Sequence, residues 1–441
     1  MPSDDAFEQR LHARIHAPHW WLAFSGGLDS MVLLHRLVTF CREHTSPRLT
    51  ALHVHHGLQA DADQWAAFCQ QVCANLGVEC RVLSVTVQAG SGQSIEMAAR
   101  EARYAALEAC LNHGEVLWMA HHQDDQAETM LMRLLRGAGP AGLAGMPVER
   151  PLGEARVVRP LLDTPRQVLE VYARAHALEW VDDPSNDSLQ MDRNFLRHEI
   201  LPRLAERWPA YRQGMTRSAH WLREQASVEH EALHALLTPR MGQDRYGCFL
   251  VLDGLERWSG ALRQALLRQW LQVLHWPMPS AARLASLDQD VLLSRPDAHG
   301  TWAMNDGVLS RFQQRLYRHP AILPPAEGVW AEPAHAFVMN ADMRLHASAG
   351  TGAGCLCADF PLQVRYRQGG ERCRPAGRGH SQTLKHLMQE YAVPPWLRDA
   401  VPLLYAGDTL VAVGDYWVCA EYEAAENQTG WKIHWEIAVA N

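Results

Sequence analysis

The sequence predicts an α/β protein with an N-terminal doubly wound parallel sheet, a mainly helical middle domain and a small α+β C-terminal domain. Two observations predict the sheet: short apolar runs alternate four times with segments of helical periodicity, and a polar cluster follows each run. A third observation is the change of pattern beyond about residue 225, first to helices and then to turns rich in glycine and arginine. At 441 residues, the chain is long enough for two or three hydrophobic cores.

The predicted strands are the apolar runs at residues 19–24, 49–55, 80–87 and 116–120. The segment after the first run carries Met31, Leu34 and Val38 at helical spacing, which predicts a helix packed on the sheet. Ligands of such sheets bind beyond the carboxyl ends of the strands. The candidate chemical segments are therefore residues 25–30, 56–57, 90–94 and 121–128.

The rest of the chain follows a helical and then a mixed pattern. Thr164 followed by Pro165 predicts a helix cap with proline at the first helical position. Further predicted helices lie at residues 193–223, 260–275, 281–293 and 383–391, and further predicted strands at 401–405 and 410–413. The proline-rich residues 320–325 have the composition of a linker. The predicted domains are residues 1–225, 226–325 and 326–441.

Composition excludes several classes of protein. Hydrophobic residues make up 47% and charged residues 20%, and no apolar run reaches the roughly 20 residues of a membrane span. The acidic N-terminus lacks the features of a secretory signal, so we expect a cytoplasmic protein without a membrane role. The ten cysteines are expected to be reduced thiols and not a disulfide framework. A net charge of −8 argues against a uniformly basic surface, although nearly all positive charge is arginine, which suits phosphate contacts.

The run Ser25-Gly26-Gly27-Leu28-Asp29-Ser30 lies between the first predicted strand and its helix. Glycine amides, hydroxyl groups and the positive end of a helix dipole can converge there on a phosphate. The run lacks the lysine and the spacing of a G-x-x-x-x-G-K-[ST] loop, which argues against simple phosphoryl transfer. Its bland alternative is a tight strand-to-helix connection. The run resembles the loop of PP-loop ATP pyrophosphatases, of the adenine nucleotide alpha hydrolase-like type.

A second cluster gathers Asp124, Asp125 and Glu128 at the start of a predicted helix, next to His121 and His122. Three carboxylates at such spacing repel one another unless a positive group lies between them. A magnesium ion or a substrate ammonium would supply that charge. The preference of helix N-termini for acidic residues explains one or two carboxylates but not three. A zinc site at the paired histidines lacks further ligands at the usual spacing.

Smaller motifs, in their order along the chain, resemble those of the tRNA(Ile)-lysidine synthases. The resemblance covers roughly the first 225 residues and resumes at residues 365–413. The motifs are His53-Val54-His55-His56-Gly57-Leu58, Glu96-x3-Arg100-x2-Arg103-Tyr104, the stretch at 136–143, Asp183-Pro184-Ser185-Asn186, and Arg193-Asn194-x2-Arg197. For His53 and His55, a role in the core is at least as plausible as one in catalysis.

The resemblance implies a reaction and its site. The family uses ATP to adenylate the C2 oxygen of the wobble cytidine in an isoleucine tRNA with a CAU anticodon. The lysine ε-amine then displaces AMP, and the modified tRNA reads AUA as isoleucine. It implies that residues 25–30 bind ATP and that Asp29 belongs to the ATP and Mg²⁺ site. Asp125 and Glu128 are the implied lysine site, with Arg100 as a further catalytic candidate nearby.

Two arginine-rich surfaces are predicted to bind the tRNA. One includes Arg193 and Arg197, and the other includes Arg372, Arg374 and Arg378. Such surfaces make binding depend strongly on salt, whereas the alternative is an ordinary solvated surface. The second surface resembles the C-terminal domain of longer lysidine synthases, which engages the acceptor end of the tRNA. No obligate protein partner is expected.

Three other functions fit the sequence less well. A PP-loop tRNA thiolase of the 2-thiocytidine type also adenylates a cytosine oxygen, but the Cys-x2-Cys pair of those enzymes is absent from this sequence. An amidotransferase similar to GMP synthetase needs a glutaminase domain, for which no nucleophilic cysteine motif is found. A catalytically inert tRNA-binding protein would not need Asp29, Asp125 and Glu128 together.

Overall fold

The computed structural model describes residues 2–55, 57, 61–87, 95–184, 188–293, 300–304 and 307–437. The chain divides into two compact units, residues 1–229 and 230–441. Predictions that fall on residues 56, 58, 90–94 and 185–186 lie outside the described residues. Among the described helices, we find none with the length and apolar character that a membrane crossing requires.

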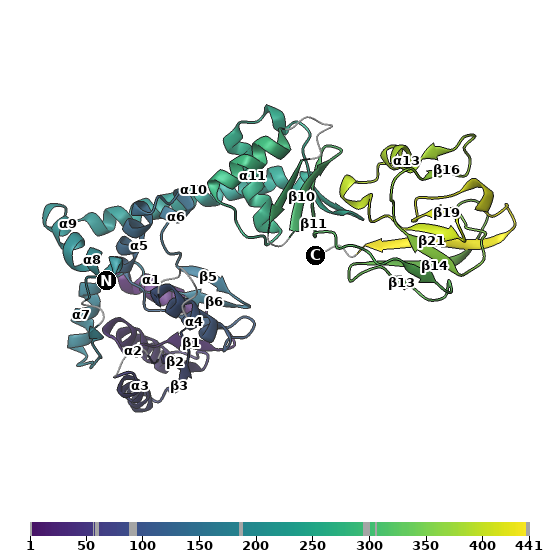
Figure 1. The fold of residues 1–441 in the computed structure, drawn as a ribbon. Coiled ribbons are helices and arrows are strands. Elements are labelled where there is room, and N and C mark those ends of the chain that lie inside the picture. Colours follow the sequence, from purple (N-terminus) through teal and green to yellow (C-terminus); the bar gives the residue numbers. More distant parts are fainter. Residues whose placement is uncertain are drawn as a thin grey trace. The chain divides into compact units, whose positions relative to one another are not determined.

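A six-stranded sheet with the order β3-β2-β1-β4-β6-β5 forms the centre of the first unit (Figure 1). All neighbouring strands pair in parallel except β5, which is antiparallel to β6. In the middle of the sheet, Leu22 pairs with Ala51 on one side and with Trp118 on the other. The strands are β1 (Trp20–Ala23), β2 (Leu49–His55), β3 (Glu79–Ser84), β4 (Val116–Trp118), β5 (Glu149–Leu152) and β6 (Ala155–Val158). The predicted doubly wound parallel sheet is confirmed.

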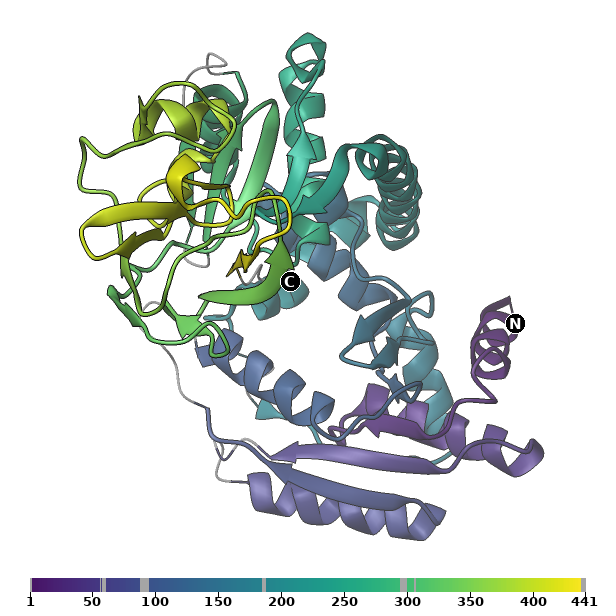
Figure 2. The ribbon, with the colours of Figure 1, turned by 90° about the vertical axis from the view of Figure 1, so that its right-hand side faces the viewer.

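Helices cover both faces of this sheet because successive strand residues point to opposite sides. Trp20 and Leu22 join the core that includes α1 (Pro2–His12), α2 (Leu28–Glu43), α3 (Ala62–Leu76) and α7 (Arg166–Ala175). Trp21 points the other way and joins the core under α4 (Ile95–Glu108). In Figure 2, α3 lies along strands β2 and β3.

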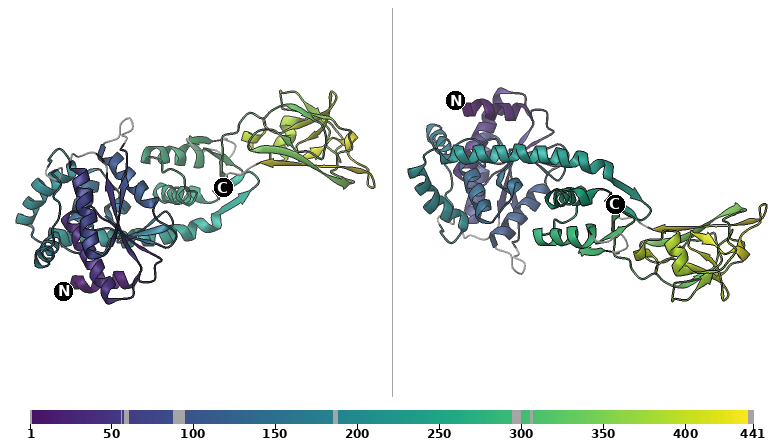
Figure 3. Two further views of the ribbon diagram at one scale, coloured as in Figure 1. Left: turned by 90° about the horizontal axis from the view of Figure 1, so that it is seen from below. Right: turned by 90° about the horizontal axis from the view of Figure 1, so that it is seen from above.

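A helical segment packs on α5 (Gln123–Leu135), which follows β4. Ala127 of α5 shares a small core with Leu201 and Tyr211. The predicted helix at 193–223 is divided into α8 (Asp192–Phe195), a π-helical turn (Leu196–Ile200), α9 (Leu201–Arg207) and the long α10 (Tyr211–Leu237). Figure 3 shows α10 as one continuous helix, and the short α6 (Pro140–Leu143) lies after α5 in the chain.

The second unit begins with helices packed on an antiparallel sheet of order β7-β8-β11-β10-β9. The predicted helices are present as α11 (Gly260–Val273) and α12 (Ala281–Leu287), the latter continued by a π-helical turn (Asp288–Leu292). Trp270, Leu284 and Leu309 belong to their common core. The strands are β7 (Met241–Asp244), β8 (Gly247–Val251), β9 (Thr301–Met304), β10 (Gly307–Phe312) and β11 (Arg315–His319). This sheet was not predicted from the sequence.

The remaining residues form an α+β arrangement around one core that includes Leu345, Leu387 and Leu403. Its main sheet has the order β12-β15-β18-β19-β20, and a second sheet has the order β13-β14-β21. The elements are β12 (Gly328–Trp330), β13 (Phe337–Val338), β14 (Met343–Thr351), β15 (Leu362–Arg365), β16 (Arg372–Cys373), β17 (Gln382–Thr383), α13 (Leu384–Glu390), β18 (Leu403–Ala406), β19 (Thr409–Val413), β20 (Trp417–Val418) and β21 (Thr429–Ile437). The domain boundaries at 225 and 325 stay predictions.

The cap predicted at Thr164 and Pro165 is wrong. Pro165 is itself the N-cap residue of α7, and no side chain at that position caps the helix. The first helical amide, that of Arg166, instead donates to the Asp124 carboxylate over 2.9 Å. The carboxylate of Asp124, 42 residues earlier in the chain, therefore accepts from the helix N-terminus in place of Thr164.

Candidate functional site

The loop between β1 and α2 is folded tightly at the carboxyl edge of the sheet. Gly26 has a φ of +84°, and a β-carbon there would lie 2.8 Å from the Cys69 sulfur, so glycine is required. The hydroxyl oxygens of Ser25 and Ser30 lie 3.1 Å apart, and Ser30 donates to the Gly27 carbonyl over 2.9 Å. Gly27 caps α2, whose first turn contains Leu28 and Asp29. The six predicted loop residues thus surround the N-terminus of a 16-residue helix, where phosphate binding is favoured.

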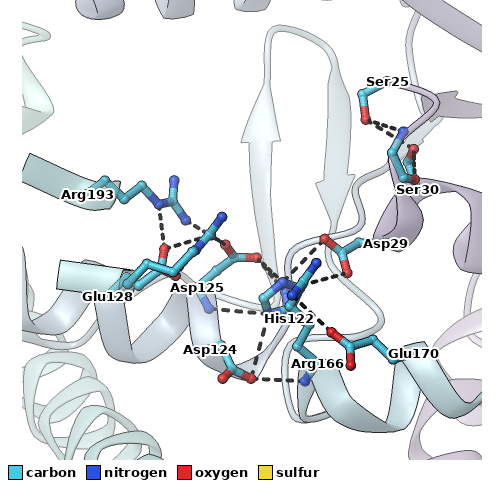
Figure 4. Close-up of polar contacts among 12 residues, drawn as sticks. Ser25, Asp29, Ser30, His122, Asp124, Asp125, Glu128, Arg166, Glu170 and Arg193 are labelled. Atoms are coloured by element: carbon cyan, nitrogen blue, oxygen red, sulfur yellow. Dashed lines mark hydrogen bonds and ion pairs between the residues drawn. The ribbon is translucent and has the colours of Figure 1, made fainter. Parts of the chain in front are cut away.

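His122 connects this loop to the carboxylate cluster (Figure 4). Its Nε2 lies 3.4 Å from Oδ2 of Asp29 and 3.4 Å from Oδ2 of Asp125. It also caps α5, since its backbone amide donates to Asp125 over 2.9 Å and the Asp125 amide donates to its Nδ1 over 3.4 Å. Burial lowers the pKa of His122, but the attraction of Asp125, Asp29 and Asp124 outweighs it and raises the pKa above its usual value. Protonation of Nδ1 would end the cap bond from the Asp125 amide.

Asp125 and Glu128 are buried and paired with two arginines. Arg193 bridges them, with Nε 2.6 Å from Glu128 and Nη2 2.6 Å from Asp125. Arg197 holds Glu128 with two nitrogens, at 2.7 and 3.1 Å, and lies 3.4 Å from Asp125. Burial would raise the pKa of Asp125, yet His122, Arg193 and the other positive neighbours lower it to about 2. Asp125 is therefore ionised at neutral pH.

The third carboxylate of the cluster, Asp124, points to different partners. Its Oδ1 lies 2.5 Å from Nε of Arg212 on α10, and its Oδ2 accepts the amide of Arg166. The magnesium ion or substrate ammonium suggested by the sequence is therefore not needed to offset the charge of the three carboxylates. Arginines of the chain itself supply the positive charge, and they are far from the carboxylates in sequence.

Arg100 lies beside the site, in a group with aromatic and basic side chains. It is exposed on α4, and its guanidinium carbon lies 5.1 Å from the centre of the Tyr104 ring. Arg150 lies 5.0 Å from the same ring, and the buried Arg159 follows β6 directly. Among the described residues, Arg100 forms no ion pair with Asp125 or Glu128, so its predicted catalytic role stays a prediction.

The histidines near the sheet edge differ in environment. Burial lowers the pKa of His121 to about 3, so its ring is neutral. His53 is buried on β2 and its Nδ1 lies 3.0 Å from the Phe24 carbonyl oxygen, where it donates a structural hydrogen bond. His55 lies 3.0 Å from Asp63. This geometry favours the core role over the catalytic one for His53.

The C-terminal arginines differ in whether their contact partner is charged or neutral. Arg374 lies 2.7 Å from Glu421, and Arg378 forms an ion pair with Glu390. Arg372 bonds to the Ser381 carbonyl oxygen, a neutral group, over 2.9 Å. The positive potential of this surface is therefore smaller than the number of arginines suggests.

Asp29 has the properties of a ligand for Mg²⁺ beside a phosphate. Within the described residues, its Oδ1 is buried and accepts no hydrogen bond, although Nε of Arg166 lies 3.9 Å away. Magnesium commonly uses one or two carboxylates together with substrate phosphates and water. Across the described part of the chain, no three histidine, cysteine or acidic residues gather in a way that could hold a metal. The donor set thus fits a metal bound jointly with a nucleotide.

The sequence does not predict the observed contacts of three residues of the site. His122 was weighed only as a zinc ligand, although a polar residue three positions before Asp125 has the spacing of a reciprocal helix cap. Arg212 belongs to the same predicted arginine-rich tRNA surface as Arg193 and Arg197, and Arg166 has no predicted role. No local pattern could have paired Arg212 with Asp124, because they lie 88 residues apart.

Three family descriptions match the chain in order. A PP-loop domain matches residues 4–204, a TilS substrate binding domain matches residues 250–317, and a TilS substrate C-terminal domain matches residues 362–435. The first match contains the loop and the carboxylate cluster, and the third contains Arg372, Arg374 and Arg378.

Curated relatives match nearly the whole chain. The tRNA(Ile)-lysidine synthase of Pseudomonas aeruginosa is 43% identical and covers 99% of this chain and 97% of its own length. That of Xanthomonas campestris pv. campestris is 42% identical over 95% of both chains. That of Coxiella burnetii is 37% identical over 93% of this chain and 92% of its own. By this similarity over nearly its full length, the chain belongs to the tRNA(Ile)-lysidine synthase family.

Proposed function

We propose that this protein uses ATP to join lysine to C2 of the wobble cytidine in the CAU anticodon of tRNA(Ile), giving lysidine, AMP and diphosphate. The observation that carries the proposal is the position of His122. It lies between Asp29, in the loop at residues 25–30, and Asp125 of the carboxylate pair. A nucleotide site and a cation site are thereby adjacent at one edge of the sheet. The match to a PP-loop domain supports the use of ATP, and the names of the relatives support the tRNA and the product.

The first step activates the base. The cytosine C2 oxygen attacks the α-phosphorus of ATP, the bond to the β-phosphate oxygen breaks, and diphosphate leaves. The amides and hydroxyls of residues 25–30 bind the phosphates at the start of α2. Asp29 would hold Mg²⁺ beside the phosphates, and the ion would offset their negative charge.

The second step transfers lysine. The ε-ammonium binds at Asp125 and Glu128 and loses a proton to one of these carboxylates. The amine nitrogen then attacks C2 of the cytosine, the bond from C2 to its former oxygen breaks, and AMP departs with that oxygen. Adenylation is required because an amide-like oxygen is a poor leaving group and AMP is a good one. The two acidic side chains favour a cation over a neutral side chain, which selects for lysine over apolar amino acids.

The thiolase alternative is less favoured. The curated relatives are lysidine synthases, and their similarity extends over nearly the entire chain. The sequence contains no cysteine between Glu115 and Gly247, where the site-forming segment 121–212 lies.

Lysine incorporation tests the function. We expect radiolabelled lysine, with ATP and Mg²⁺, to enter an unmodified CAU-anticodon isoleucine tRNA, with one AMP formed for each lysine. A methionine tRNA with the same anticodon is the control and should remain unlabelled. AMP formation without label would contradict lysine as the nucleophile, and label in both tRNAs would contradict the proposed tRNA specificity.

Replacement of Asp29 tests the nucleotide site. We expect Asp29→Asn to lower the rate of AMP formation by about a hundredfold or more. The metal ion that offsets the phosphate charge would lose its carboxylate ligand. The far-UV circular dichroism should stay unchanged, because one oxygen of Asp29 accepts no hydrogen bond from the described part of the chain. Glu8→Ala, on the exposed side of α1, is the control and should keep wild-type turnover. A folded Asp29→Asn protein with normal turnover would refute the assignment.

The C-terminal arginines can be ranked by their contacts. Arg372→Gln should weaken tRNA binding and reduce the slope of log K against log salt by about 1, because this charge has a neutral partner. Arg374→Gln should have a smaller effect on the slope, because Glu421 already offsets that charge. Arg257→Gln, an 86% exposed arginine elsewhere in the second unit, controls for net charge. An unchanged slope for Arg372→Gln would remove this residue from the interface.

A further inference from the structure

The lysine-binding carboxylates of the proposed function are already bonded to cations of the chain. Asp125 and Glu128 carry two negative charges, and Arg193 and Arg197 bring two positive charges into contact with them. His122 adds a further titratable group 3.4 Å from Asp125. An incoming ammonium would meet a balanced cluster, since Glu128 is 1% exposed and has no unoccupied side facing water. Lysine therefore binds there by replacing a guanidinium.

The geometry identifies Arg193 as the group to be replaced. Its Nε and Nη2 contact one oxygen of each carboxylate at 2.6 Å, which is how a single ammonium would bridge the same two oxygens. Arg197 has a different role, because it holds both oxygens of Glu128 from one side. If Arg193 leaves, Glu128 keeps Arg197, and Asp125 keeps His122 and the more distant Arg197. Each carboxylate thus keeps a hydrogen-bond donor, and the lysine ammonium would offset the negative charge that Arg193 leaves behind.

The segment that carries Arg193 is built so that it can shift. Arg193 lies on α8, a helix of four residues, and a π-helical turn follows it at once. A π turn holds about one residue more than an α turn, so its conversion to α-helix rotates the preceding residues by about 100°. An exposed ion pair at 3.2 Å, between Arg136 and Asp192, also holds the start of α8, and exposed pairs are weak.

We propose that Arg193 occupies the lysine-ammonium position in the free protein and that bound tRNA withdraws it, so that lysine binds after the tRNA. The planar guanidinium is well suited to a phosphate group, which gives Arg193 an alternative partner when the polyanion is present. This inference rests on the proposed function. It adds an order of binding, and it protects the carboxylates from other cations until the base is in place.

The test is calorimetric titration of L-lysine into the full chain, without ATP, in the presence and absence of CAU-anticodon isoleucine tRNA. For the wild type, we expect the lysine dissociation constant to fall about tenfold or more when tRNA is present, because the fraction of open sites rises. For Arg193→Gln without tRNA, we expect lysine to bind about tenfold or more tightly than to the wild type without tRNA. The gap between the two conditions should then close.

Matched controls separate this role from a structural one. Arg174→Gln removes an exposed arginine of α7 and should behave as the wild type. Norleucine, which keeps the α-ammonium but lacks the ε-ammonium of lysine, should gain no affinity from Arg193→Gln. Equal lysine affinity of the wild type with and without tRNA would overturn the inference, and this comparison needs no variant. Weaker or unchanged lysine binding by folded Arg193→Gln would overturn it as well.

The same experiments distinguish this inference from the proposed function. Wild-type protein that incorporates lysine into tRNA but binds lysine equally well without tRNA would refute the order of binding alone. Wild-type protein that neither binds lysine with tRNA present nor incorporates it would refute both.

Discussion

The bonds between the buried carboxylates of α5 and the arginines of the following helical segment are the constraint on which the site depends. Burial of the Asp125 and Glu128 side chains would be costly without these partners, because burial of an unpaired charge is strongly unfavourable. Their short contacts to Arg193 and Arg197 also bring residues 192–200 against the sheet domain. The chemistry and the packing of this segment therefore have a common origin.

The same edge of the sheet brings the nucleotide loop within reach of this cluster. Parallel strands end on one side, so the segments after β1, β4 and β6 meet although they are far apart in the chain. His122 links them, since it caps α5 and contacts Asp29 and Asp125. The charge of Asp29 therefore influences Asp125 through one buried ring.

Much of the fold could be predicted, because buried parallel strands and amphipathic helices have clear periodicities; β2 spans the predicted residues 49–55. The sheet of order β7-β8-β11-β10-β9 could not be predicted from the sequence, for a physical reason. The β10–β11 hairpin turns at Gln313 and Gln314 with φ of 46° and 58°, where glycine or asparagine would have given a signal. The loop at residues 25–30 and the carboxylate cluster of α5 could be recognised as sequence motifs. The arginine partners of the carboxylates could not be predicted, because pairs such as Glu128 and Arg197 lie 69 residues apart.

A double-mutant cycle between Glu128→Gln and Arg197→Gln tests the central claim most directly. Native-state hydrogen exchange of α5 and α9 amides would give the free energy of opening for the wild type, both single variants and the double variant. The account predicts a coupling of at least about 1.5 kcal/mol, since each single variant leaves a buried charge with fewer partners. Effects that add to within about 0.5 kcal/mol would contradict it.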